Sequence, residues 1–154
     1  MESKLGRIIM LYEYDVIEAV CAYLESQDYQ ILQKLKPTQS GDDIVAVKKG
    51  NQNRKLLIEA KGETSSRKGS SRYGKQFSSA QVRGHVSSAF YKAAEVLSRE
   101  PADVEIRVGI ALPITTNHQR MIEYIIPTLN QLGILVFWVA ENGDVSIEGS
   151  LDFN

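Results

Sequence analysis

Apolar positions follow two different periods along the 154-residue chain, and together they predict alternating helices and strands. In three segments, apolar side chains recur every three or four residues, which is the pattern of an amphipathic helix. The first two predicted helices cover residues 12–26 and 78–99. The third is expected to begin at residues 115–116, two threonines that can cap it, and to end before Gly133. Pro127 lies inside this helix and should kink or shorten it.

Shorter apolar runs between the helices predict β-strands, separated by polar turns such as residues 36–41 and 49–53. The strands are expected at residues 29–35, 43–48, 55–61, 104–112, 134–140 and 145–147. The element order α-β-β-β-α-β-α-β(-β) predicts an α/β fold with a central mixed β-sheet flanked by helices. A chain of this length fits a single domain, which we assign to residues 1–154.

Composition and charge restrict the possible classes of protein without assigning a function. No apolar run approaches the roughly 20 residues needed to span a bilayer, and no secretion signal is recognisable. We therefore expect a cytoplasmic protein without a membrane segment. The single cysteine, Cys21, excludes a disulfide or a thiolate metal cluster within one chain. The net charge of -1 counts mildly against a DNA-binding protein, although a local basic patch can still bind phosphate.

The strand predicted at residues 55–61 carries a carboxylate and an ammonium group at its end. Because side chains alternate between the two faces of a strand, Glu59 and Lys61 point the same way. Asp43 begins the preceding strand, and a short hairpin brings it within reach of Glu59. Two neighbouring carboxylates repel each other unless a cation lies between them, and oxygen ligands suit a hard divalent ion such as Mg²⁺. An ordinary surface salt bridge at a sheet edge is the alternative interpretation.

The segments G-D-D-I-V-A and I-E-A-K-G resemble the two motif strands of the PD-(D/E)XK nuclease superfamily, whose fold is restriction-endonuclease-like or Holliday-junction-resolvase-like. The resemblance selects Asp43 over Asp42, because the family places its acid directly before an apolar pair and a small residue. It implies that Asp43 and Glu59 hold Mg²⁺ or Mn²⁺ and that Lys61 serves the attacking water. Relatives commonly carry Gly in the place of Asp28.

The resemblance also implies two assisting residues on the predicted helices. A glutamate of the first helix often joins the site, and we prefer Glu13, which lies on the apolar row, to Glu18, which lies on a solvated row. The second helix often supplies a glutamine near its start, and Gln81 fits this position. The alternatives are an acid favoured by the helix dipole for Glu13 and a solvent-facing residue for Gln81.

The segment 62–77 follows Lys61 directly and is rich in Ser, Gly, Lys and Arg. Its basic residues are predicted to bind nucleic acid: Arg67, Lys68, Arg72 and Lys75. In this interpretation the segment tracks phosphates above the site, whereas the alternative is a solvated linker. Arg83 and Lys92 could extend the basic patch.

The sequence as a whole predicts a metal-dependent endonuclease that hydrolyses phosphodiester bonds, with DNA as the expected substrate. A single domain leaves no separate unit for reading sequence, so we expect structure-directed or partner-directed cutting, or a homodimer that doubles the binding surface. One alternative is a catalytically inactive nuclease-fold protein that binds nucleic acid or another protein. A weaker one is an interaction module built on the strand at residues 134–140.

Overall fold

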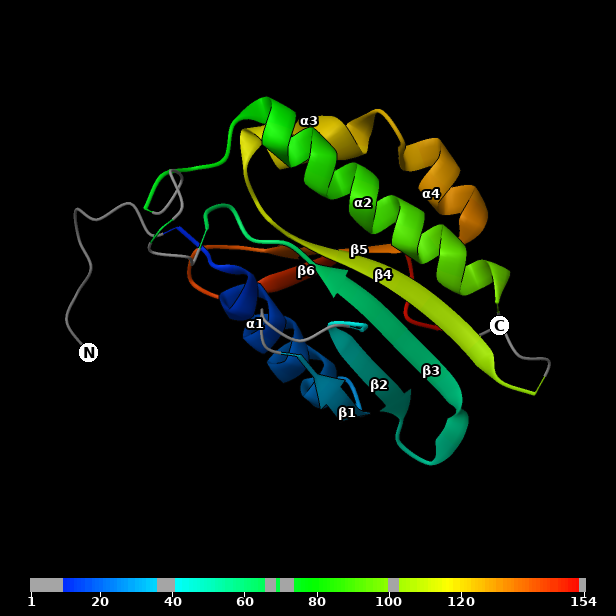
Figure 1. The fold of residues 1–154 in the computed structure, drawn as a ribbon. Coiled ribbons are helices and arrows are strands. Elements are labelled where there is room, and N and C mark those ends of the chain that lie inside the picture. The colour runs from blue at the N-terminus through cyan, green and yellow to red at the C-terminus, as the bar shows by residue number, and fades with distance from the viewer. Residues whose placement is uncertain (1–9, 36–40, 66–68, 70–73, 100–102, 153–154) are drawn as a thin grey trace, which may run out of the picture.

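The computed structural model describes residues 10–35, 41–65, 69, 74–99 and 103–152. Its centre is a six-stranded sheet in which the strands follow the chain order from β1 to β6 (Figure 1). The strands are β1 (Tyr29–Lys34), β2 (Ile44–Lys48), β3 (Asn51–Ala60), β4 (Glu105–Pro113), β5 (Leu135–Val139) and β6 (Val145–Glu148). The predicted α/β class, with a mixed sheet flanked by helices, is confirmed.

Strand direction changes in the middle of the sheet. The pairs β1–β2 and β2–β3 are antiparallel, the pairs β3–β4 and β4–β5 are parallel, and β5–β6 is antiparallel again. In the β2–β3 register Ile44 lies opposite Ile58, and in the β3–β4 register Glu59 lies opposite Ile110. As a result, the start of β2 and the carboxyl end of β3 meet at one edge of the sheet.

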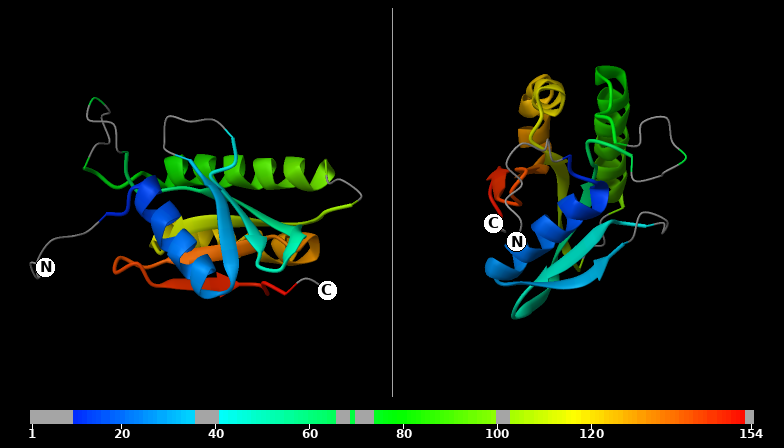
Figure 2. Two further views of the ribbon diagram at one scale, coloured as in Figure 1. Left: turned by 90° about the horizontal axis from the view of Figure 1, so that it is seen from below. Right: turned by 90° about the vertical axis from the view of Figure 1, so that its left-hand side faces the viewer.

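Helices cover both faces of the sheet, as the two views in Figure 2 show. The helices are α1 (Glu13–Ser26), α2 (Ser79–Ser98), α3 (Thr116–Glu123) and α4 (Ile126–Leu132). On one face α1 packs on a core that includes Ile58, while on the other face α2, α3 and α4 enclose a second core that Leu57 contacts. The strand β5 is buried along its whole length. Among the described helices none is long and apolar enough to cross a membrane.

One predicted element boundary is wrong, whereas the effect expected of Pro127 on the third helix is confirmed. The turn predicted at residues 49–53 contains only Lys49 and Gly50, and β3 begins at Asn51. The φ of Gly50 is 84°, so this glycine supplies the left-handed turn and the polar residues after it continue as an exposed arm of the hairpin. The predicted third helix is two helices, because Pro127 occupies the first turn of α4, where its missing N–H needs no partner.

Asp28 connects α1 to β1 in a conformation that glycine usually adopts. It has a φ of 62°, the one positive φ of a non-glycine residue in the described part of the chain. Aspartate tolerates this left-handed region better than most residues do. Asp28 therefore takes a backbone geometry for which glycine is the usual choice.

Candidate active site

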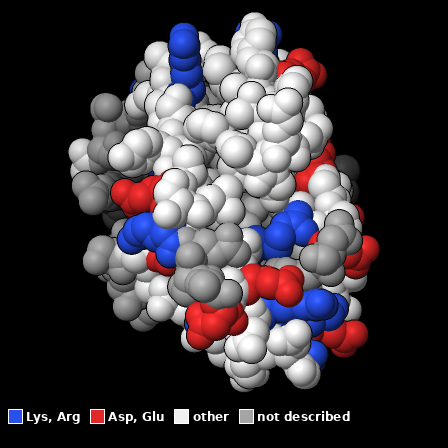
Figure 3. Space-filling model, turned by 90° about the vertical axis from the view of Figure 1, so that its right-hand side faces the viewer, with Lys and Arg blue, Asp and Glu red and all other residues white. Residues whose placement is uncertain are grey.

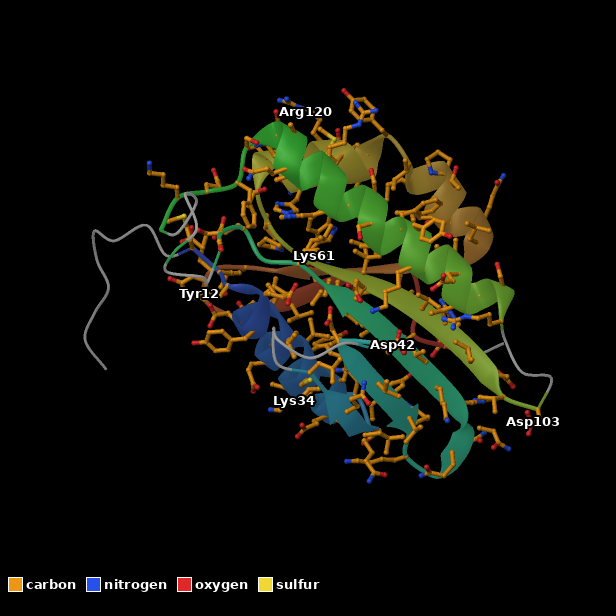
Figure 4. The ribbon with its side chains drawn as sticks, in the orientation of Figure 1. Tyr12, Lys34, Asp42, Lys61, Asp103 and Arg120 are labelled. Carbon is orange, nitrogen blue, oxygen red and sulfur yellow. The ribbon has the colours of Figure 1, made fainter. Side chains whose placement is uncertain are left out.

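Asp43, Glu59 and Lys61 meet where β2 begins and β3 ends. Asp43 lies one residue before the Ile44–Ile58 pair, so it faces Glu59 across the hairpin. The backbone N–H of Ala60 donates a hydrogen bond of 2.8 Å to Oδ2 of Asp43. Lys61 Nζ lies 3.3 Å from Glu59 Oε1. Figure 4 shows Lys61 at the carboxyl end of β3, beneath α2, with Asp42 nearby at the start of β2.

A second lysine, Lys92 of α2, completes this cluster. Its Nζ lies 2.8 Å from Glu59 Oε2 and also donates a hydrogen bond to the carbonyl oxygen of Gly41. The sequence had suggested Lys92 only as an extension of the basic patch. It lies two helical turns after His85, on the flank of α2 that faces β3, and this spacing is the signal that could have placed it at the site.

Charge crowding changes the proton affinity of the two acids beside Glu59. Burial raises the pKa of Asp43 to about 7; the negative charges of Glu59 and Glu13 add to the rise, while the Ala60 N–H and Lys92 oppose it. Burial also raises the pKa of Glu13, with Lys61 acting against the rise and Glu59 adding to it. Glu13 therefore belongs to the same electrostatic cluster as the three motif residues.

Close packing at Gly62 brings the start of α1 to the end of β3. A Cβ on Gly62 would lie 2.5 Å from the backbone nitrogen of Glu13 and 2.8 Å from the carbonyl carbon of Tyr12. Next to it, the N–H of Glu63 donates to the carbonyl of Leu11 over 2.9 Å, and the N–H of Leu11 donates to Glu63 Oε1 over 2.7 Å. These contacts fix Glu13 beside the site, and no local sequence pattern predicts them.

Gly62→Ala is expected to lower the free energy of unfolding by about 1–3 kcal/mol, because the new methyl group collides with backbone atoms that cannot rotate away. Chemical denaturation measures the effect. Gly84→Ala is the matched control: this glycine lies on the exposed side of α2 with open space around its Cα, so alanine should stabilise the chain by up to about 1 kcal/mol. Equal stability of Gly62→Ala and the parent would contradict the close approach.

The flank of α2 that bears Lys92 also carries a neutral histidine near Lys61. Burial lowers the pKa of His85, and the positive charge of Lys61 lowers it further. The His85 ring packs edge-on against Phe77, with the ring centroids 4.6 Å apart. Burial, with a contribution from His85, likewise lowers the pKa of His118 to about 4. Both imidazoles are therefore uncharged at neutral pH, and the positive charge at the site comes from its lysines.

The remaining residues predicted on helices have local partners. Gln81 closes the capping box of α2: its Oε1 accepts from the Ser78 N–H at 2.9 Å, and its own N–H donates to Ser78 Oγ at 3.3 Å. This interaction fixes the beginning of the helix that supplies Lys92. Glu18 is ion-paired with Lys34 at 2.8 Å, and both side chains are at least half exposed. This agrees with the solvated row to which the sequence assigned Glu18.

The basic segment after Lys61 is described only at its base. Thr64 and Gln76 form an antiparallel bridge, and Thr64 Oγ1 donates to the carbonyl of Lys75 over 2.6 Å. Lys75 is exposed there. The other three predicted phosphate contacts lie outside the described residues: Arg67, Lys68 and Arg72. The base of the segment is thus anchored directly beside the carboxyl end of β3.

Two comparisons with known proteins found no relative of this chain. No protein-family model matches the chain, and no curated protein matches it. Membership of the PD-(D/E)XK superfamily, and the restriction-endonuclease-like fold in particular, therefore stay predictions. Their support is the motif residues and the way in which the sheet assembles them.

The two facing carboxylates provide oxygen donors for a hard divalent cation. In the described part of the chain, no group of three or more His, Cys, Asp or Glu side chains could hold a metal ion. Mg²⁺ commonly takes only one or two protein carboxylates and completes its shell with water and phosphate oxygens, so the pair Asp43 and Glu59 fits this ion by donor type and number. Without a metal, Lys61 and Lys92 balance the charge of Glu59.

Proposed function

We propose that this chain is a metal-dependent endonuclease of the PD-(D/E)XK type that hydrolyses phosphodiester bonds, with DNA as its substrate. The observation that carries the proposal is the convergence of Asp43, Glu59 and Lys61 at one edge of the sheet. Such a grouping places two oxygen donors and one cation on the same face, beside a segment rich in Lys and Arg. A structural salt bridge would not require a second acid at this place, and burial, with the charge of Glu59 adding to it, raises the pKa of Asp43.

Each side chain has a role in this proposal. Asp43 and Glu59 would hold Mg²⁺ or Mn²⁺, an ion that supplies Lewis acidity toward the phosphate and lowers the pKa of water. The Lys61 ammonium group would orient the attacking water and stabilise the negative charge that develops on the phosphate. The water oxygen bonds to phosphorus, one P–O ester bond breaks, and the departing oxygen takes up a proton. Glu13, whose pKa is raised, would accept a proton from the water.

The nucleic acid is expected to approach the end of the molecule where β3 runs into the basic segment. Lys75 is exposed at the base of this segment, and we propose that it contacts phosphates together with Arg67, Lys68 and Arg72. The face shown in Figure 3 lies at the other end of the molecule. Basic and acidic residues are interspersed on it, so they form no field of one sign that would attract a polyanion.

A second candidate function is a nuclease-fold module that binds nucleic acid or a protein without cutting. The contacts of Glu59 favour it, because Lys61 and Lys92 already neutralise both carboxylate oxygens. In that case the lysines replace the metal permanently. The two candidates differ in one measurable property, which is the affinity for a divalent cation.

Isothermal titration with Mn²⁺ separates the two candidates. The parent chain should show one binding site, and Glu59→Gln should weaken it at least about tenfold, because a neutral amide replaces a charged ligand. Glu18→Gln is the matched control, since Glu18 is an exposed acid paired with Lys34, and it should bind Mn²⁺ as the parent does. Identical binding by Glu59→Gln and the parent, or no binding by either, would leave only the non-cutting module.

A further inference from the structure

A groove of about 670 Å³ lies between α2 and α3, and the proposed catalytic residues do not line it. Its apolar lining includes Val86, Phe90 and Met121, which belong to the second core or pack against it. Arg83 contributes to its wall from α2 and Arg120 from α3. Such a shape combines an apolar floor with positive charge at the sides, which is the usual composition of a site for an amphipathic ligand.

The charge of the groove is of one sign. Neither Asp nor Glu is among its lining residues, and Ser79 and Ser87 add hydroxyl groups. Within the described residues, neither Arg83 nor Arg120 forms a salt bridge. Two unpaired guanidinium groups beside hydroxyl groups match the hydrogen-bonding needs of phosphate oxygens.

An aromatic ring at the groove is open to solvent. Tyr124, just after α3, lines the groove and is 74% exposed. An exposed tyrosine next to arginines is a platform on which a nucleobase can stack, because every base has a π-face and the arginines hold the phosphates on either side. Bases in a duplex are already stacked on each other, so this platform suits an unpaired strand.

The groove and the catalytic cluster lie on opposite flanks of α2. Lys92 projects from one flank to Glu59, whereas Arg83 and Phe90 project from the other flank into the groove. In Figure 4, Lys61 lies beneath α2 and Arg120 lies on the far side of that helix. A helix with its side chains is about 10 Å across, a distance that a few nucleotides of an extended strand can span. One strand that crosses the beginning of α2 can therefore reach both places.

We propose that the α2–α3 groove binds an unpaired segment of the nucleic acid, with its phosphates on Arg83 and Arg120 and a base on Tyr124. This inference rests on the proposed nuclease function and adds a substrate class to it: nucleic acid with a single-stranded stretch next to the cleavage point. The groove holds the strand on one side of α2 while the scissile phosphate lies at Lys61 on the other side.

Fluorescence anisotropy with a labelled single-stranded DNA oligonucleotide tests the groove, in a chelator-containing buffer so that no strand is cut. Arg83→Ala and Arg120→Ala should each weaken binding and each lower the slope of log affinity against log salt by about 0.7, the value for one lost phosphate contact on a single strand. Tyr124→Ala should weaken binding about fivefold or more without changing that slope. Tyr124→Phe keeps an aromatic ring and should bind with the affinity of the parent.

Arg99→Ala is the matched control, because Arg99 follows the other end of α2 and is exposed beside Glu95. It should retain the affinity and the salt slope of the parent. Unchanged binding in both groove arginine variants, an equal loss in Arg99→Ala, or no binding of the oligonucleotide by the parent would each overturn the inference. A parent that binds through the groove but never cuts would instead refute the nuclease function alone.

Discussion

Lys61→Ala is expected to reduce the rate of strand cleavage by at least about 100-fold, the usual contribution of a positioned group that handles the proton or the developing charge. The Lys61 ammonium lies 3.3 Å from Glu59, only 19% of the Lys61 side chain is exposed, and alanine leaves the strand geometry intact. Because Lys92 remains paired with Glu59 when Lys61 is removed, the unfolding free energy should fall by no more than about 2 kcal/mol. Single-turnover cleavage and denaturant titration measure the two quantities.

Lys55→Ala is the matched control for this experiment. Lys55 lies on β3, on the same face as Lys61 and six residues earlier, so it carries the same charge about 20 Å from the site. Its removal should leave cleavage nearly unchanged. Cleavage by Lys61→Ala at the parent rate would show that the assigned chemistry is wrong, even if the fold is right.

Asp43→Asn is expected to abolish cleavage and at the same time stabilise the protein. Asparagine keeps an oxygen that accepts the Ala60 N–H but removes a negative charge that is buried beside Glu59 and Glu13. At about pH 8 and without metal, the unfolding free energy should rise by about 1–3 kcal/mol. A catalytic residue that reduces the stability of its own fold is the expected trade-off at an active site.

The raised pKa of Asp43 determines how the gain in unfolding free energy of Asp43→Asn changes with pH. The folded-state pKa of Asp43 is about 7, above its ordinary value of 3.8, so folding favours the protonated form. The stability that this proton confers is fully present below about pH 4 and is lost as the pH rises through about 7. The stabilisation by Asp43→Asn should therefore be small in acid and grow up to neutral pH. Asp42→Asn, at the half-buried neighbour, is the control for the loss of one carboxylate from the same turn.

If the difference in unfolding free energy between Asp43→Asn and the parent is constant from about pH 4 to 8, then Asp43 does not titrate in this range. If the unfolding free energy of Asp42→Asn relative to the parent rose with pH in the same way, the effect would not be specific to Asp43. Chelator in every sample keeps divalent ions from stabilising the parent, because an ion held by Asp43 would reverse the comparison.

Hydrophobic periodicity predicted most of the fold because its elements follow the rules of local patterning. The apolar stripe of α2 and the continuous apolar run of β5 are long enough to be unambiguous. The turn at residues 49–53 was mispredicted because polarity alone does not determine backbone conformation. Asn51 and the next two residues are polar yet extended, since an exposed hairpin arm tolerates them. At Pro127 the expected interruption of the third helix is a new helix start, because the first helical turn needs no N–H there.

The site was predictable only as far as strand geometry determines it. The facing of Asp43 and Glu59 and the common face of Glu59 and Lys61 follow from a hairpin and from alternation. The helical spacing puts Lys92 on the same flank of α2 as His85, but only the packing of α2 on the sheet determines that this flank faces β3. The contact of Gly62 with the start of α1 is likewise a tertiary contact, with no local pattern to announce it.

The most direct test of the central claim is strand cleavage by the purified chain, measured on branched, single-stranded and duplex DNA and on RNA, with Mg²⁺, with Mn²⁺ and with chelator. A nuclease of the proposed type should make internal cuts in at least one DNA substrate with either ion, and none with chelator. Intact substrates in every metal-containing reaction, or equal cutting in chelator, would contradict a divalent cation held by Asp43 and Glu59.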